Sequence, residues 1–132
     1  MAPALETLIN AATSAREAAY APYSGFAVGA ALLSEDEQLF IGANVENISF
    51  GLTMCAERVA VGRAIASGCR QFSQIIIVSD SRDPVSPCGA CRQVLAEFAP
   101  DIRVVSVTLT GKTFEAPLSE LLPRPRTGIL GT

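Results

Sequence analysis

Apolar residues recur at helical spacing near the start of the chain. They are Leu5, Leu8, Ile9, Ala12, Ala15 and Ala19. This period predicts an amphipathic helix over residues 4–19 that ends before Ala21-Pro22, because proline disfavours helical backbone in the residue before it.

Two apolar runs follow, over residues 27–34 and 39–45, and the acidic segment 35–38 joins them. Short apolar runs around a turn are typical of a β-hairpin. The elements expected after the hairpin are a helix over 54–66, a buried strand over 74–79, a helix over 88–98, a strand over 103–109 and a short helix over 119–122.

The alternation of strands and helices after the hairpin predicts parallel pairing with helical crossovers, and so an α/β fold. In such a sheet, the helices that follow parallel strands begin at the same edge. Residues near 55 and 88 are therefore expected to lie close together, at the edge where open α/β sheets bind ligands.

Composition indicates one domain over residues 1–132 with more apolar surface than a small monomer normally buries. The chain is 49% hydrophobic and only 17% charged, whereas about 25% charged residues is usual. Part of this surface is expected to lie between subunits, because obligate homo-oligomer interfaces resemble a domain core.

The net charge of −3 argues against a nucleic-acid partner, which would require a basic surface. The sequence contains no apolar run of about twenty residues and no pattern typical of a signal peptide. We therefore expect a cytoplasmic protein without a membrane partner. In a reducing compartment, its four cysteines are expected to have metal-binding or catalytic roles and not to form disulfides.

Three of these cysteines are expected at helix starts: Cys55 at one, and Cys88 and Cys91 at the other. A helix N-terminus favours the thiolate that zinc requires, and cysteines three apart share a helical face. Three ligands leave one tetrahedral position of the metal open for water, as in catalytic zinc sites.

Glu57 lies two residues after Cys55, where its carboxylate can take a proton from that water without binding the metal. The sequence has no histidine, so sulfur must hold the ion, and three thiolates give a zinc site of net negative charge. Arg58 and the two helix termini are the sources of positive potential that can offset it.

The chain resembles the small, three-cysteine class of zinc-dependent cytidine deaminases over nearly its whole length. The matching segments are Pro22–Phe26 with Val28-Gly-Ala, Asn44–Asn47, Cys55–Arg58, Pro87–Val94 and Leu121–Pro123. The Cys-Ala-Glu and Pro-Cys-x-x-Cys elements form the signature of zinc deaminases.

This resemblance implies a three-layer fold with a five-stranded mixed sheet, one Zn²⁺ per chain, and a homotetramer whose pockets neighbouring subunits complete. It also implies hydrolytic deamination of cytidine and deoxycytidine, with Glu57 as the catalytic residue. The residues it implies around the nucleoside are Phe26, which packs against it, Asn44 and Glu46 at the ribose, and the backbone of Ala56 and Ser86 at the base. Arg58 is implied as a donor to the metal thiolates.

The sequence departs from its relatives at three places. Many relatives have a stacking phenylalanine soon after Leu-Leu-Pro, where this chain offers only Ile129 or Leu130 as apolar cover. Phe50 stands where some relatives have tyrosine, and Glu37 stands where glycine is usual in the hairpin turn. The last difference predicts an altered turn without a change in chemistry.

Other functions stay open from the sequence. Cys69 could supply a fourth thiolate and close a structural zinc site, although such a site gives no reason for Glu57. A redox Cys-x-x-Cys protein would leave both Cys55 and Glu57 unexplained. Within the deaminases, enzymes that act on blasticidin, guanine, 4-substituted cytosines or nucleic acid are the alternatives.

Overall fold

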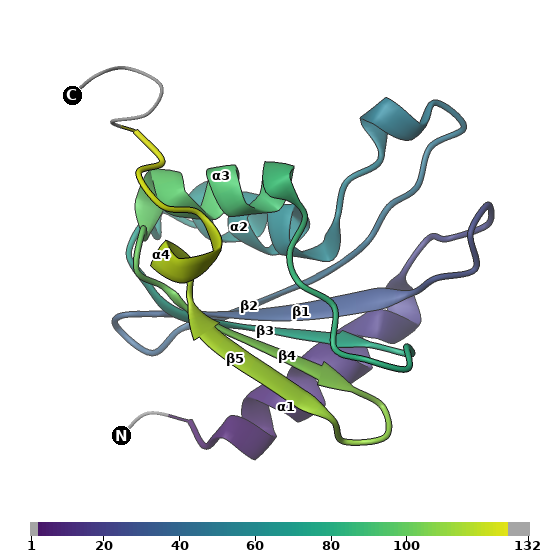
Figure 1. The fold of residues 1–132 in the computed structure, drawn as a ribbon, viewed down its shortest axis with the longest axis horizontal. Helices are drawn as coiled ribbons and strands as arrows, with labels where there is room; N and C mark the ends of the chain where they lie inside the picture. Colours follow the sequence, from purple (N-terminus) through teal and green to yellow (C-terminus); the bar gives the residue numbers. More distant parts are fainter. Residues whose placement is uncertain (1–2, 127–132) are drawn as a thin grey trace.

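Five strands form one mixed sheet in the computed structural model, which describes residues 3–126 (Figure 1). Its order is β2-β1-β3-β4-β5. The strands are β1 (Val28–Ser34), β2 (Leu39–Ala43), β3 (Phe72–Ser79), β4 (Arg103–Thr108) and β5 (Thr113–Pro117). The five-stranded mixed sheet implied by the family resemblance is confirmed.

The pairing of the strands places the helix starts on one edge. β1 runs antiparallel to both β2 and β3, and β3 pairs with β4 in parallel. Consequently β2, β3 and β4 all point the same way. The predicted parallel pairing holds for β3 and β4, whereas β1 of the hairpin lies between β2 and β3. β5 runs antiparallel to β4.

Helices cover both faces of the sheet and make three layers. α1 (Leu5–Ala15) packs on one face, and α2 (Ala56–Ala66) and α3 (Gly89–Phe98) pack on the other. The short α4 (Leu118–Leu121) follows β5. The first helix is shorter than predicted, because its last turn becomes the 3-10 helix η1 (Arg16–Ala18).

Two glycines allow the helices to approach the sheet closely. A Cβ atom at Gly42 in β2 would overlap the carbonyl oxygen of Ala56 at the start of α2. A Cβ atom at Gly29 in β1 would overlap the carbonyl oxygen of Ala12 in α1. Only glycine fits where two backbones come this close. Gly42 therefore fixes the position of the α2 N-terminus, which carries Cys55 and Glu57.

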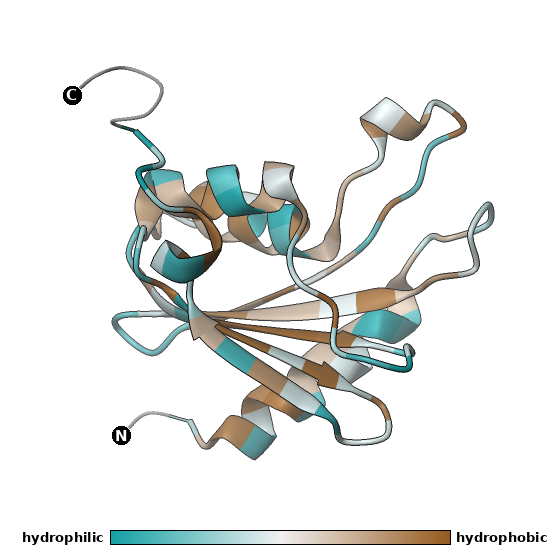
Figure 2. Ribbon diagram, in the orientation of Figure 1, coloured by the Kyte–Doolittle hydropathy of each residue, from teal (hydrophilic) through white to brown (hydrophobic). Residues whose placement is uncertain are grey.

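The connection between β2 and α2 extends away from the sheet as an arm, which we define as residues 45–54 (Figure 1). It contains the 3-10 helix η2 (Phe50–Leu52) and carries apolar stretches (Figure 2). The side chains of Ile48, Phe50 and Leu52 are 80%, 76% and 67% exposed. In residues 3–126, no helix is long and apolar enough to span a membrane.

Candidate metal and catalytic site

Two cysteines form the N-caps of the helices on the α2/α3 face. Cys55 precedes α2 and Cys88 precedes α3, both with extended backbone and neither with a capping bond from its side chain. Cys91 lies in the first turn of α3 and is buried. The first backbone N–H groups of a helix have no intrahelical partner, so both helices present positive partial charge to these thiols.

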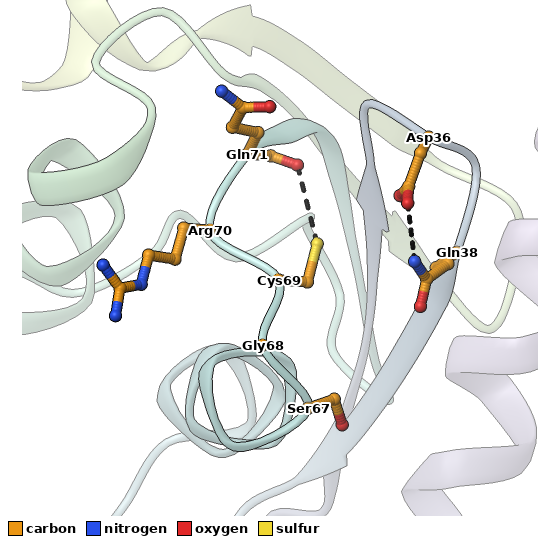
Figure 3. Close-up of a pocket in the computed structure, with 7 residues that line it drawn as sticks. All are labelled: Asp36, Gln38, Ser67, Gly68, Cys69, Arg70 and Gln71. Atoms are coloured by element: carbon orange, nitrogen blue, oxygen red, sulfur yellow. Dashed lines mark hydrogen bonds between the residues drawn. The ribbon is translucent and has the colours of Figure 1, made fainter.

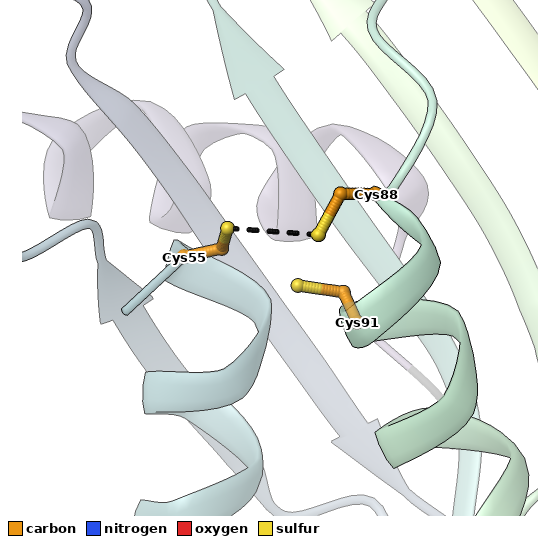
Figure 4. A group of neighbouring side chains, drawn as sticks. All are labelled: Cys55, Cys88 and Cys91. Carbon is orange, nitrogen blue, oxygen red and sulfur yellow. Dashed lines mark hydrogen bonds between the residues drawn. The ribbon is translucent and has the colours of Figure 1, made fainter. Parts of the chain in front are cut away.

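The three thiols meet between the two helices (Figure 4). Their sulfur atoms all lie within 4.8 Å of one another, and the Cys55 and Cys88 sulfurs are 3.8 Å apart. The structure thus brings together the three cysteines that the sequence singled out. Thiolate sulfur is a preferred ligand of Zn²⁺, and three thiols at these separations can bind one ion. The donor set therefore fits zinc, with one coordination position left over.

Arg58 projects toward this thiol cluster from the first turn of α2. Its Nη2 donates to the Cys55 sulfur at 3.5 Å and to the backbone oxygen of Thr53 at 3.2 Å. Its Nε atom is buried without a hydrogen-bond partner in the described part of the chain. Arg58 therefore lies where its charge can offset negative charge on the thiolates.

Glu57 is buried beside the same cluster, with only 5% of its surface exposed. Burial raises the pKa of its carboxyl group, and the negative charge of a Cys55 thiolate raises it further. No ion pair within residues 3–126 includes its carboxylate. A buried carboxyl group that is easily protonated can both accept and donate protons near neutral pH.

In the protein without a metal ion, the pKa values of Cys55 and Cys91 are shifted in opposite directions. A hydrogen bond from the Cys91 thiol, together with the hydrogen bond and positive charge of Arg58, lowers the pKa of Cys55 to about 5. The same hydrogen bond and burial raise the pKa of Cys91 above the ordinary range of a thiol. The cluster thus carries negative charge at neutral pH before any ion binds, which favours a cation among the three sulfurs.

A cavity of about 310 Å³ opens onto Glu57, Cys55 and Cys88. Its volume lies within the range of small-molecule sites. Phe26, Val28, Asn44, Thr53, Ala56, Ile77, Val85 and Ser86 complete the wall. Four of the five residues that the resemblance places around the nucleoside, Phe26, Asn44, Ala56 and Ser86, therefore line one cavity with Glu57.

Asn44 and Glu46 both support the loop that carries Phe26. Asn44 accepts a hydrogen bond from the backbone N–H of Val28 and donates one to the backbone oxygen of Phe26. The Glu46 carboxylate accepts bonds from the backbone N–H groups of Tyr23 and Ser24 and from the Ser24 hydroxyl. These bonds lower the pKa of Glu46. Glu46 itself is not among the residues that line the cavity.

Cys69 is remote from the thiol cluster. It follows the C-terminal end of α2, where its N–H bonds to the Ala64 carbonyl, whereas Cys55 caps the opposite end. A helix of this length separates the two by about 16 Å. Cys69 instead lines a separate hollow of about 330 Å³ with Asp36 and Arg70 (Figure 3). This placement rules out Cys69 as a fourth ligand in this fold.

Sequence reasoning missed several residues of the site. The cavity-lining residues Val28, Ile77 and Val85 have the apolar character of core positions, so no pattern distinguishes them. Thr53 and Arg92 are polar, but their contacts depend on tertiary structure. The candidates Ile129 and Leu130, considered as apolar cover, lie outside the described residues.

Residues 3–108 match the family described as the cytidine and deoxycytidylate deaminase zinc-binding region. A cytidine deaminase of Halalkalibacterium halodurans is 52% identical over 119 residues, covering 89% of this chain and 90% of that protein. A blasticidin-S deaminase of Bacillus cereus is 34% identical, covering 73% of this chain and 74% of that protein.

Solved structures of similar proteins have the same fold. The crystal structure of a cytidine deaminase from Burkholderia pseudomallei superposes with a TM-score of 0.90 at 46% identity, covering 92% of this chain and 98% of that one. A cytidine deaminase from Mycobacterium tuberculosis gives a TM-score of 0.78 at 38% identity, with coverage of 90% and 94%.

Proposed function

Because the chain belongs to the cytidine and deoxycytidylate deaminase zinc-binding family, we propose that it hydrolyses the 4-amino group of cytidine and deoxycytidine. The products are ammonia and uridine or deoxyuridine, as in pyrimidine salvage. One observation carries the proposal: a buried carboxyl group, Glu57, faces the same small cavity as a three-thiol cluster. A structural zinc site offers no role for such a carboxyl group.

Cys55, Cys88 and Cys91 would hold the zinc ion of this family. When bound, zinc supplies the Lewis acidity that makes water nucleophilic near neutral pH. Arg58 stabilises the ligand set by donating to Cys55. It also holds the segment before α2 in place through the Thr53 carbonyl.

Glu57 moves the protons of the reaction. Its carboxylate accepts a proton from the attacking water and delivers it to the ring nitrogen N3 of the substrate. As the C4–O bond forms and the C4–N bond breaks, it passes the second proton to the departing amine, which leaves as ammonia. Its burial and raised pKa suit a group that must alternate between the two protonation states.

Asn44, Glu46, Phe26 and Ala56 hold the nucleoside in this proposal. Phe26 offers an apolar face to the cavity, and the Ala56 backbone reaches the base at the start of α2. The Glu46 carboxylate has about four lone-pair sites, of which three accept bonds from the loop. One acceptor site is left for a ribose hydroxyl.

A homotetramer is the proposed assembly. The apolar side chains of the arm beside the cavity are exposed in a single chain, and large exposed apolar surfaces mark interaction sites.

A cytoplasmic location is proposed because the described cysteines are free thiols, which a reducing compartment preserves.

Loss of cytidine absorbance in the ultraviolet, measured with purified zinc-loaded protein, tests the activity.

A second assay with 3′-CMP tests whether Glu46 lies next to the ribose hydroxyls of the bound substrate. A 3′-phosphate next to this carboxylate would bring two negative charges together in a partly desolvated site. We expect rapid turnover of cytidine and deoxycytidine, little of 3′-CMP, and none of single-stranded DNA.

Glu46→Gln should lose discrimination between cytidine and 3′-CMP, because the repulsive charge is gone. Equal kcat/KM for the two substrates in the unaltered protein would contradict the placement of Glu46. Turnover of blasticidin S with none of cytidine would instead support the weaker resemblance, to the blasticidin-S deaminase.

A further inference from the structure

The side chain of Arg92 connects α3 to the segment before it and to α4. From the first turns of α3, its Nε donates to the backbone oxygen of Pro87 at 2.7 Å. One terminal nitrogen donates to the Ser86 hydroxyl at 3.0 Å, and the other to the backbone oxygen of Leu121 in α4 at 3.0 Å. All three nitrogen atoms of the guanidinium group thus donate a hydrogen bond.

One of these acceptors, Ser86, lines the proposed active site, and another, Pro87, lies between two residues that line it. Ser86 lines the cavity together with Val85 and Cys88, and Pro87 is fully buried directly before Cys88. The segment from residue 80 to residue 88 contains no helix or strand. Its position therefore depends on side-chain contacts, and Arg92 supplies two of them, to Ser86 and Pro87.

The third acceptor connects this wall to the C-terminal part of the chain. Leu121 ends α4, whose Leu118 is fully buried in the core cluster on the same side of the sheet. The neighbouring Gln93 donates to the backbone oxygen of Pro125 at 3.4 Å. α3 thus contacts the cavity wall and α4 through Arg92, and the segment after α4 through Gln93.

Arg92 makes these bonds to neutral oxygen atoms, and no carboxylate within the described residues pairs with it. Its contribution is therefore geometric, and it does not neutralise a charge. A planar guanidinium group with donors on three sides can satisfy three acceptors at once, whereas a lysine ammonium group cannot reach the same set.

We propose that Arg92 is a positioning residue that fixes the Ser86–Cys88 wall of the cavity and couples it to α4. The inference rests on the proposed deaminase function. Arg92 does not touch the substrate in this account. It acts through Ser86 and the backbone before Cys88, so its loss displaces a wall that must lie within a fraction of an ångström of the reacting group.

The test compares Arg92→Ala with the unaltered protein and with Arg103→Ala, which removes an exposed arginine paired with Glu115. A misplacement of about 1 Å can cost a factor of about one hundred in rate. We expect Arg92→Ala to lower kcat about tenfold to a hundredfold. KM for cytidine should change little, because Phe26 and Asn44 come from other segments of the cavity wall. Arg103→Ala should match the unaltered protein.

Guanidinium ion at millimolar concentration should restore part of the kcat of Arg92→Ala by occupying the vacated position, and Arg103→Ala should not respond. General loss of stability would not be rescued in this way. Amide hydrogen exchange supplies a readout besides activity: in Arg92→Ala, residues 80–88 and 118–122 should lose protection together while α2 keeps its protection.

An Arg92→Ala enzyme with unchanged kcat, or with unchanged exchange in residues 80–88 and 118–122, would overturn the positioning role. Zinc content per chain identifies a variant that has simply lost its metal. If the unaltered protein fails to deaminate cytidine, the proposed function fails. Hydrogen exchange still decides whether Arg92 couples the two segments.

Discussion

Four side chains at the starts of α2 and α3 have different roles in the site. Cys55, Cys88 and Cys91 gather their sulfur atoms within 4.8 Å, while Glu57 stays protected from solvent beside them. The helix starts make this possible, because N-cap residues leave the helix axis and can point toward a neighbouring helix. Sequence spacing alone identified these residues, since each belongs to a short motif.

Removal of single cysteines tests the ligand set. Cys91→Ala should abolish stoichiometric zinc binding, because two thiolates hold zinc far less tightly than three. Cys69→Ala should retain one zinc ion per chain, because Cys69 lies at the other end of α2. Metal analysis of the purified variants by atomic absorption measures this. Zinc loss in Cys69→Ala would contradict the three-sulfur site.

At the scale of the elements, the contact between β2 and α2 positions the catalytic residues. A methyl group at Gly42 would overlap the backbone of α2, and overpacking of this kind costs about 1–3 kcal/mol. We expect Gly42→Ala to lower the melting temperature and also the activity and zinc content of the folded protein, because α2 carries Cys55 and Glu57.

Gly29→Ala is the matched control for Gly42→Ala. Its methyl group would displace α1 on the opposite face of the sheet. It should destabilise the protein similarly while its folded fraction keeps more of its zinc and activity. Equal loss of zinc in both variants would show that the position of α2 does not depend on Gly42.

The hairpin turn between β1 and β2 contains a residue in a strained conformation. Glu37 has a φ of 68°, in the left-handed region that favours glycine. A side chain in this conformation costs about 1–2 kcal/mol. Replacement by glycine removes this strain, but glycine also loses more conformational entropy on folding, which reduces the gain. Glu37→Gly should therefore raise the free energy of unfolding by up to about 1 kcal/mol.

Urea denaturation measures this change. Gly111→Ala, at a turn glycine with a φ of 94°, should change stability in the opposite direction. A Glu37→Gly protein less stable than the parent would show that contacts of the glutamate outweigh its backbone strain. The sequence predicted an altered turn at Glu37, and in this chain Glu37 has a left-handed backbone conformation.

Within residues 3–126, the hydrophobic pattern predicted all four α-helices and four of the five strands, but not the 3-10 helix η2. The exception is β5, a five-residue edge strand in which only Ala116 is buried. Its alternation of polar and apolar residues is short and ends at Pro117, so the pattern did not indicate a strand. The position of β1 between β2 and β3 was also not predicted, because a local hairpin pattern does not determine which of its strands pairs with a distant one. The clustering of helix starts followed from strand direction, which the insertion of β1 leaves unchanged.

For the whole molecule, we expect the exposed arm to connect activity to assembly. Ile48 and Leu52 are 80% and 67% exposed in the single chain, and burial of such side chains would contribute about 25 cal/mol per Å² of apolar surface. We expect sedimentation to give four times the mass of one chain. A double Ile48→Asp, Leu52→Asp variant should sediment at lower mass and lose activity in parallel.

A single chain of unaltered sequence that is fully active at assay concentration would contradict this link between assembly and activity. The low charge content of the sequence predicted an oligomer, but composition did not indicate which residues would form its interface. The arm became recognisable only when the fold showed that its apolar residues have no cover within residues 3–126.

The central claim is that Glu57 transfers protons beside a zinc ion that it does not bind. Glu57→Gln tests it most directly, with zinc content and cytidine turnover measured on the same preparation. General acid–base catalysis contributes about 10² to 10⁴ in rate, or about 3–5 kcal/mol. We predict one zinc ion per chain and a loss of turnover at or beyond the upper figure. A fully zinc-loaded variant that retains a tenth of the activity would contradict the account.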